Sequence, residues 1–346
     1  MALVEERPKE RGGTLVERVP PSYWVLAVLL LIMPAFASDF TLFQIFGWTF
    51  ILGMIALSLM FLAGYGGMVS LVQMTIAGLA GYMVAILGSS AIDISMGWPW
   101  YINIPLAIMI AALFGTIVGA LAVRTDGIYT IMITLAIASA FFYFTRQNYV
   151  IFNGFSGFNG VLPPQLFGVD WRSATAFYYL TLFWAVLSFL VVLYVSRAPF
   201  GLALQGVRDN PRRMAALGFN VNAHRIAAYT FASVIAAIGG ILLTWQSAQI
   251  SPGTAGIGPV IDILVIAVIG GMRRPIGPFI GAFIYVLLKT FAIDVLIALG
   301  LSGDRFQLLI GLSFLVIVFW SPDGILGLWD RWQENRGKDP LTGDRS

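Results

Sequence analysis

The sequence predicts an all-α polytopic membrane protein, and its composition is the main reason. Hydrophobic residues make up 59% of the 346 residues and charged residues only 11%, while the mean hydropathy is +0.86. A soluble domain carries about 25% charged residues. A chain this apolar exceeds what a soluble core can bury, so we expect lipid to be its main solvent and helices to cross it.

The hydrophobic segments predict about ten membrane spans, because a helix needs about 20 apolar residues to cross a bilayer. The first and eighth segments are the shortest. The expected spans are Tyr23–Ala37, Leu42–Ala63, Met74–Ile92, Ile102–Val123, Ile128–Thr145, Ala174–Val195, Arg225–Ser247, Pro259–Met272, Ile276–Ala298 and Phe306–Trp320.

Positive charge orients these spans. With the N-terminus in the cytoplasm, 16 of the 20 Lys and Arg residues fall inside, and Arg146, Arg172 and Arg305 fall outside. An excess of Lys and Arg is typical of cytoplasmic loops. We therefore expect residues 1–22 and 322–346 to be cytoplasmic tails and residues 23–321 to form the transmembrane domain. Two cytoplasmic ends require an even number of spans.

The span count also permits an internal repeat. Ten spans divided five and five give halves of opposite orientation, which is the arithmetic of an inverted repeat. The glycine-rich breaks Gly64–Gly67 and Gly270–Gly277 are expected as loose counterparts. The pairs Gly115/Gly119 and Gly277/Gly281 have the small-residue spacing that lets helices approach closely.

A long outer loop, residues 147–173, is rich in Asn, Gly and Pro, which predicts an ordered loop with many turns. Two interpretations of its aromatic residues are open. They pack on the membrane surface or on a partner, or they form an interfacial aromatic belt. The aromatic residues are Phe152, Phe155, Phe158, Phe167 and Trp171.

The cytoplasmic loop, residues 196–224, is the most informative polar segment. Asp209 and Asn210 suit the N-cap of a short helix, Pro211 suits its first position, and Gly218 suits its left-handed end. A folded basic loop between two spans predicts docking of a soluble partner. The alternative is that its arginines serve only as a topology signal. These arginines are Arg197, Arg208, Arg212 and Arg213.

Few residues are suited to catalysis or metal binding. The chain has no cysteine and one histidine, His224, which we interpret as an interfacial cap. It contains no phosphate-binding G-x-x-x-x-G-K-[ST] motif and no H-E-x-x-H or G-x-S-x-G motif. We therefore expect no enzyme activity of its own, no metal, no cofactor and no nucleic acid partner.

Ionisable residues within spans are costly and indicate function by default. Asp262, Lys289 and Asp294 are the candidates. An ion pair between Lys289 and Asp262 on adjacent helices has two interpretations, a lining group for a zwitterionic substrate or a structural bridge. The scarcity of such residues argues mildly against a proton-coupled carrier. We add Gln73 to the candidate pathway residues.

Three segments resemble the permease subunits of branched-chain amino acid ABC transporters, in particular the M-type subunit. The matching residues of Ala56–Leu87 are Gly64, Tyr65, Gly67, Ser70, Leu71, Gln73, Gly78 and Tyr82. Those of Gly201–Asn222 are Arg208, Asp209, Asn210, Ala215, Ala216, Leu217 and Gly218. The third segment, Val268–Ala282, resembles a glycine-rich family motif in which Arg273 replaces a common glycine.

The resemblance implies a permease of the bacterial inner membrane. Its expected partners are a second permease subunit, two cytoplasmic ATPase subunits and an extracytoplasmic substrate-binding protein. It implies that the cytoplasmic loop couples to the ATPases through Arg208, Asp209, Asn210, Arg212, Arg213, Ala215, Ala216 and Gly218. The implied substrates are branched-chain or related amino acids. Urea, short amides or another small polar solute, and a stand-alone channel or secondary carrier, are the alternatives.

Overall fold

The computed structural model describes residues 28–92, 95–125, 127–165, 168, 170–298, 311, 315, 324 and 325, with only the backbone described for 292–298. The helices are α2 (Trp48–Met60), α3 (Gln73–Leu87), α4 (Trp100–Ala122), α5 (Ile128–Gln147), α6 (Tyr149–Phe152), α7 (Ala174–Arg197), α8 (Pro199–Asp209), α9 (Pro211–Ala216), α10 (Val221–Ser247), α11 (Ile257–Gly270) and α12 (Gly277–Ala298). Two π-helical segments, Thr41–Gly47 and Phe61–Tyr65, extend α2 at both ends. Short 3-10 helices are Met33–Ala35, Gly154–Ser156 and Pro252–Ala255.

The all-α membrane class is confirmed. Five helices are long and apolar enough to cross a membrane: Thr41–Tyr65, α4, α5, α7 and α10. Three shorter apolar helices are α3, α11 and Gly277–Phe291 within α12. These eight correspond to the second through ninth expected spans. The count of ten is not confirmed, since the first span lies partly and the tenth almost wholly outside the described residues.

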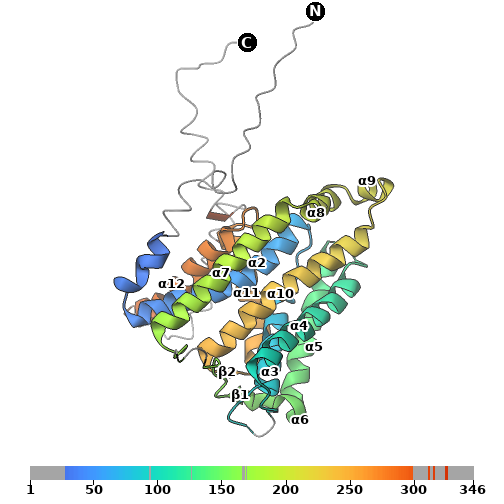
Figure 1. Ribbon diagram of the computed structural model, residues 1–346. Coiled ribbons are helices and arrows are strands. Elements are labelled where there is room, and N and C mark those ends of the chain that lie inside the picture. The colour runs from blue at the N-terminus through green and yellow to red at the C-terminus, as the bar shows by residue number, and fades with distance from the viewer. Residues whose placement is uncertain are drawn as a thin grey trace, which may run out of the picture.

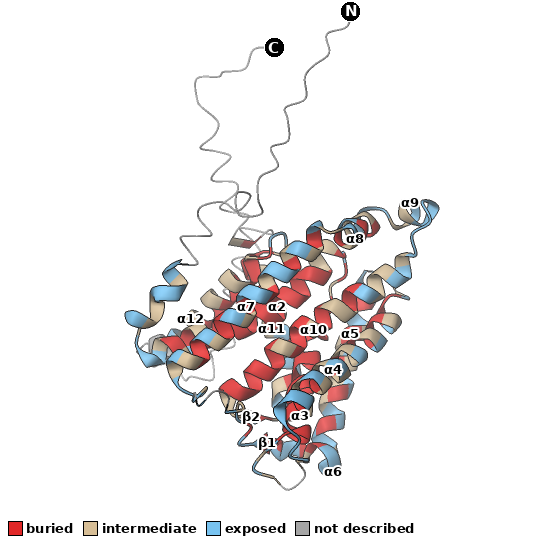
Figure 2. Cartoon of the chain, viewed as in Figure 1, coloured by how far each residue is buried: buried red, intermediate tan, exposed pale blue. Residues whose placement is uncertain are grey.

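The core is formed by the helices that are apolar all round. Helix Thr41–Tyr65 is 89% buried in its most apolar window, whereas α4 and α5 are only 28% buried. In Figure 2, α2 and α3 are almost wholly buried, while α4, α5 and α7 expose one face along their length. A helix that is hydrophobic on every side belongs inside a bundle or in lipid. Helix α10 packs between α2, α3 and α4 and joins the two halves of the bundle.

Small residues set the closest helix contacts, as the glycine spacing predicted. A side chain on Gly115 or Gly119 would collide with Ser233 or Tyr229 of α10. A side chain on Gly281 would collide with the Ile266 carbonyl of α11. These glycines therefore permit backbone approach that a larger residue would prevent.

The bundle has two ends, shown in Figure 1. Helices α8 and α9 lie at one end, and α6 lies with the two-stranded sheet at the other. That sheet pairs β1 (Phe158–Asn159) with β2 (Gln249–Ile250) in antiparallel register, with Phe158 opposite Ile250. The links between α4 and α5 and between α11 and α12 also lie at the α8–α9 end. Gly119 of α4 contacts Tyr229 of α10, and Gly64 contacts Met272, which follows α11. Segments predicted to be cytoplasmic therefore lie together.

The two short core helices support an inverted arrangement, although with different counterparts from those expected. Helix α3 has 15 residues and follows an interruption at the α8–α9 end, and α11 has 14 and follows one at the sheet end. Counterparts in an inverted repeat lie at opposite ends. Pairing Gly64–Gly67 with Gly270–Gly277 was therefore wrong, because Gly64 and Met272 are in contact at the same end.

The described part of the loop 147–173 is ordered, and its aromatic residues divide between core and surface. Phe152 and Phe158 are buried against Tyr82, with ring centroids 5.1 and 6.2 Å away. Phe155 is 68% exposed and lies beside Arg146, whose guanidinium is 5.6 Å from the ring centroid. Phe167 lies outside the described residues. The loop is thus anchored to α3 while presenting an exposed aromatic surface.

Candidate functional site

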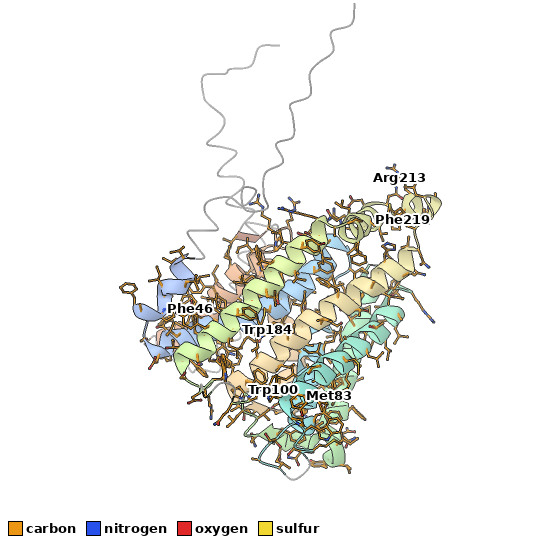
Figure 3. The ribbon with its side chains drawn as sticks, in the orientation of Figure 1. Phe46, Met83, Trp100, Trp184, Arg213 and Phe219 are labelled. Atoms are coloured by element: carbon orange, nitrogen blue, oxygen red, sulfur yellow. The ribbon has the colours of Figure 1, made fainter. Side chains whose placement is uncertain are left out.

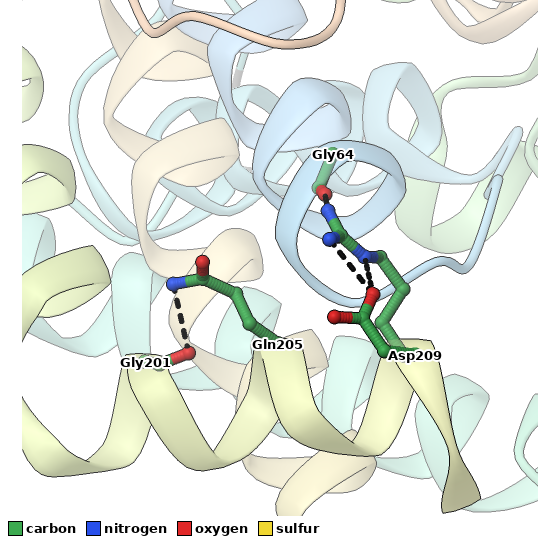
Figure 4. A network of polar contacts seen from close by, with 5 residues as sticks. Gly64, Gly201, Gln205 and Asp209 are labelled. Atoms are coloured by element: carbon green, nitrogen blue, oxygen red, sulfur yellow. Dashed lines mark hydrogen bonds and ion pairs between the residues drawn. The ribbon is translucent and has the colours of Figure 1, made fainter.

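Helix α8 lies across the end of the bundle because one of its faces is apolar or small. Gly201, Leu204 and Val207 recur every third residue and are buried. This face packs against α7, α10 and the end of the helix that contains α2. Figure 4 shows Gln205, whose Nε2 donates to the Gly201 carbonyl at 3.2 Å and also to the Ser196 carbonyl at 2.9 Å. These bonds fix the turn from α7 into α8.

Helix α9 begins and ends as the sequence predicted. The side chain of Asn210 accepts a hydrogen bond from the Arg213 backbone N–H at 2.9 Å, and Pro211 occupies the first position. Gly218 has φ +90°, and the N–H of Phe219 donates to the Met214 carbonyl at 3.1 Å. The expectation of a single short helix in this loop was incomplete, since α8 precedes it.

Most of the surface of α9 is available to a partner, apart from Met214, which packs against Gly206 of α8. No residue between Pro211 and Ala216 is buried. Arg212, Arg213 and both alanines are exposed, and Leu217 is 68% exposed. Figure 3 shows Arg213 and Phe219 at the tip beyond the bundle. Basic side chains beside small apolar ones can bind acidic groups while permitting close seating of the helix.

Arg208 is engaged within the chain. Its Nε and Nη2 each lie 2.8 Å from the Asp209 carboxylate, and its Nη1 donates to the carbonyl of Gly64 (Figure 4). Gly64 belongs to the π-helical segment that ends the first long helix. Arg208 therefore connects α8 to a membrane helix. The sequence had indicated only that this arginine could bind a partner, and that possibility is not tested by these contacts.

Gly64 joins three parts of the structure. It accepts the bond from Arg208, and a side chain at this position would collide with the carbonyl of Met272 in the α11–α12 link. The chain then turns through Gly67, whose φ is +67° and which lies against the Arg208 side chain. We call Gly64, Arg208 and Met272 the junction. Through it, α8 touches the ends of two separate helical segments.

An aromatic group connects α9 with α8 and α10. The His224 ring stacks on Phe200 with centroids 5.9 Å apart and meets Phe219 edge-on at 5.6 Å. Its Nδ1 lies 2.9 Å from the Asn220 carbonyl oxygen. The N-cap of α10 is Asn220, which accepts from the Ala223 N–H. Interpreting His224 as the cap was therefore wrong, and it packs between loop and helices instead.

The candidate pathway residues are not gathered into one site. Gln73 is 1% exposed and accepts a hydrogen bond from Ser58 at 3.0 Å. Asp262 is half-buried and interacts with the Tyr285 hydroxyl. Lys289 is exposed, with its Nζ 5.9 Å from the centroid of the Trp48 ring. The side chain of Asp294 lies outside the described residues.

The expected ion pair between Lys289 and Asp262 does not form. Within the described part of the chain, their charged atoms are not within bonding distance, and their charges act on each other only at longer range. The two residues lie on packed helices, since α11 packs against α12. Lys289 is nevertheless exposed with its Nζ over the Trp48 ring, whereas Asp262 interacts with Tyr285. Among the described residues, Lys289 therefore contacts Trp48 and does not pair directly with Asp262.

Comparison with known proteins identifies relatives over most of the chain. The family model described as "Branched-chain amino acid transport system / permease component" matches residues 41–318. The high-affinity branched-chain amino acid transport system permease protein LivM of Escherichia coli is 23% identical over 295 residues, covering 79% of this chain and 65% of the relative. The chain thus spans about 65% of the length of that relative. No solved structure matches this chain.

Two other relatives differ in what their names say they transport. The probable branched-chain amino acid transport permease protein LivM of Methanocaldococcus jannaschii is 25% identical over 236 residues, covering 64% of this chain and 67% of the relative. The fructose import permease protein FrcC of Rhizobium meliloti is 29% identical over 231 residues, covering 64% of this chain and 62% of the relative.

Proposed function

The chain belongs to the family of branched-chain amino acid transport permease components, and from this premise we propose that it is one permease subunit of an ATP-driven importer. In this proposal it resides in the bacterial inner membrane with both termini in the cytoplasm. It forms half of the pathway with a second permease subunit. Two cytoplasmic ATPase subunits drive it, and an extracytoplasmic binding protein delivers the substrate.

The geometry of α8 and α9 is the observation that carries the proposal. Helix α9 has no buried residue and presents the exposed side chains of Arg212 and Arg213. Met214 packs against Gly206 of α8, so a force on α9 reaches α8 directly. Arg208 then connects α8 to the helix end at Gly64. A protein that clasps α9 and moves it would thus pull on membrane helices.

Docking of the ATPase follows from the chemistry of α9. Arg212 and Arg213 are free to form charge-assisted hydrogen bonds with carboxylates of the partner. Ala215 and Ala216 are small and exposed, so the helix can seat deeply in a cleft. Asp209 and Asn210 form the turn between α8 and α9, and Gly218 ends α9. These residues orient the docking surface, while the arginines supply attraction.

The proposed substrates are branched-chain or related amino acids. The names of the LivM relatives support this choice. The fructose importer keeps open the alternative that the same architecture carries another small polar solute, including urea or short amides. The residues of α8 and α9 that are proposed to couple the chain to the ATPases do not distinguish among these solutes, because they lie outside the membrane.

Uptake into liposomes tests the proposal. The purified complex, with its two permeases and two ATPases, is reconstituted with ATP inside and with the binding protein and radioactive leucine outside. We expect uptake that requires ATP and all of these subunits. Equal uptake by this chain without ATPases would establish a channel or secondary carrier instead. Competition by unlabelled amino acids, urea and fructose then identifies the substrate class.

A further inference from the structure

The start of α11 lies near the middle of the membrane, as contacts between helices show. Helix α4 has 23 residues, so it is about 34 Å long and long enough to cross the hydrocarbon core of a bilayer, which is about 30 Å thick. A Cβ added to Gly115 of α4 would lie 3.2 Å from Ile76 of α3. Two residues farther along α3, a Cβ added to Gly78 would lie 3.0 Å from the Ala255 side chain. Ala255 is therefore about 13 Å from the last residue of α4 and about 20 Å from its first, measured along the helix axis.

The chain that reaches this depth is not α-helical. Helix α10 ends at Ser247, Ala248 follows with φ +54°, and α11 begins only at Ile257. The segment between them consists of β2, the 3-10 helix Pro252–Ala255 and their links. No side chain caps α11, although the first N–H groups of a helix have no acceptor within it. The break before α11 therefore presents backbone groups that need hydrogen-bond partners.

This break is exposed, whereas the comparable break before α3 is enclosed. Gly253, Ile257 and Gly258 are exposed, and a Cβ added to Gly258 would meet nothing within 4 Å. At the start of α3, by contrast, Val72 is 0% and Gln73 only 1% exposed. Irregular backbone at membrane depth is tolerated only where protein buries it or where it lines a water-filled cavity. The described residues of this chain bury the first break but not the second.

The exposed face at the start of α11 combines polar and aliphatic groups. Ile257 and Ile261 are each 47% exposed, and residues four apart lie on the same face of a helix. Gly258 is exposed between them, and the half-buried Thr254 carries a hydroxyl group just before the helix. Lipid tails supply no partners for the N–H groups and the hydroxyl, while water supplies both. Lipid is therefore excluded as the neighbour of this face.

We propose that this face, formed by Thr254, Ile257, Gly258 and Ile261, lines the water-filled pathway through which the substrate crosses the membrane. The inference rests on the proposed function, because that function supplies the pathway. The polar groups of the break keep the passage hydrated at the middle of the bilayer. Ile257 and Ile261 contact the aliphatic part of a passing solute, which fits amino acids with branched side chains.

Single cysteines test the assignment, because the chain has no cysteine of its own. Gly258→Cys and Ile261→Cys place a thiol on the proposed pathway. Leu113→Cys and Leu187→Cys are matched controls near the middle of α4 and α7, where these side chains are 60% and 37% exposed. The assembled complex in proteoliposomes is treated with the membrane-impermeant cation 2-(trimethylammonium)ethyl methanethiosulfonate. Remaining thiols are then counted, after denaturation, by the gel shift that a polyethylene glycol maleimide gives this chain.

We expect thiols at positions 258 and 261 to react about tenfold faster or more than those at 113 and 187, because the thiolate that reacts forms in water and not in apolar surroundings. Modification of either pathway variant should block leucine uptake, and a reductant should restore it. Reaction as slow as at the control positions would overturn the assignment, because protein or lipid would then cover the face. Fast reaction with unchanged uptake would also overturn it, because the face would then line a hydrated hollow outside the pathway.

Failure of the proposed function is distinguishable from failure of this inference. Uptake by the unmodified complex is measured with and without ATP before any reagent is added. Uptake that does not depend on ATP contradicts the proposed function, while the relative reaction rates of the four cysteines still report which face is in contact with water. Ile261→Cys remains informative if Gly258→Cys fails to assemble.

Discussion

Replacing Arg208 by alanine separates the internal role of this arginine from partner binding. The substitution removes the hydrogen bond to the Gly64 carbonyl and the pair with Asp209. Hydrogen bonds to charged groups are worth about 1.5–3 kcal/mol, and exposed ion pairs about 0–1 kcal/mol. Because the Arg208 side chain is 39% exposed, solvent weakens the hydrogen bond to the Gly64 carbonyl. We expect a loss of about 1 kcal/mol at the junction.

The expected consequence is poorer coupling with intact assembly. A tenfold change in an equilibrium corresponds to about 1.4 kcal/mol, so a loss of about 1 kcal/mol weakens the connection between α8 and Gly64 about fivefold. Transport per ATP hydrolysed should fall by about the same factor. Uptake and phosphate release are measured on the same proteoliposomes. The ATPases should still copurify, because α9 is unchanged. Arg212→Ala is the matched control, since its side chain is exposed and should affect association rather than coupling. Loss of the ATPases in Arg208→Ala with a normal transport ratio would refute the reasoning.

Three further predictions concern the same region. Arg212→Glu with Arg213→Glu should abolish copurification of the ATPases while leaving membrane insertion intact, because carboxylates would repel an acidic partner; normal copurification would remove these arginines from the docking surface. Gly64→Ala should lower the free energy of unfolding by about 1–3 kcal/mol, because the added methyl collides with the Met272 carbonyl. Gly258→Ala is the control and should be neutral, because a methyl there meets nothing within 4 Å. Equal melting temperatures of the two variants would contradict the close contact at Gly64. His224→Ala should reduce transport per ATP more than His224→Phe, since phenylalanine retains the stacking between two rings; equal losses in both variants would point to the imidazole nitrogens instead.

The sequence predicted helix positions well because long apolar segments leave few alternatives. Asn210, Pro211 and Gly218 also defined α9 correctly, since a cap, a first-position proline and a left-handed glycine act locally. The sequence also contains the pattern of α8, because its buried residues Gly201, Leu204 and Val207 recur every third position. This amphipathic helix was missed because the interpretation of the loop rested on its arginines.

Contacts between segments far apart in the chain could not be predicted from the sequence. Nothing near Arg208 indicates that its guanidinium reaches Gly64, because 144 residues separate them in the chain. The sequence likewise does not show whether the Lys289 side chain is buried in the bundle or exposed on it. Apart from Lys289 and Asp294, helix α12 is apolar around its axis, so periodicity does not reveal which face packs. His224 was misinterpreted for a related reason, because its ring partners come from both sides of α9.

Trapping α9 against the ATPase tests the central claim most directly. Ala215→Cys provides the only thiol in the chain, and a bifunctional maleimide crosslinker with a reducible disulfide connects it to the nearest cysteine engineered on the ATPase surface. We predict a crosslink in the nucleotide-free complex, arrest of leucine uptake while the link is intact, and recovery when the reductant cleaves it. A labelled α9 that reacts only with reagents outside the cell, or uptake that continues unchanged in the fully crosslinked complex, would contradict the account.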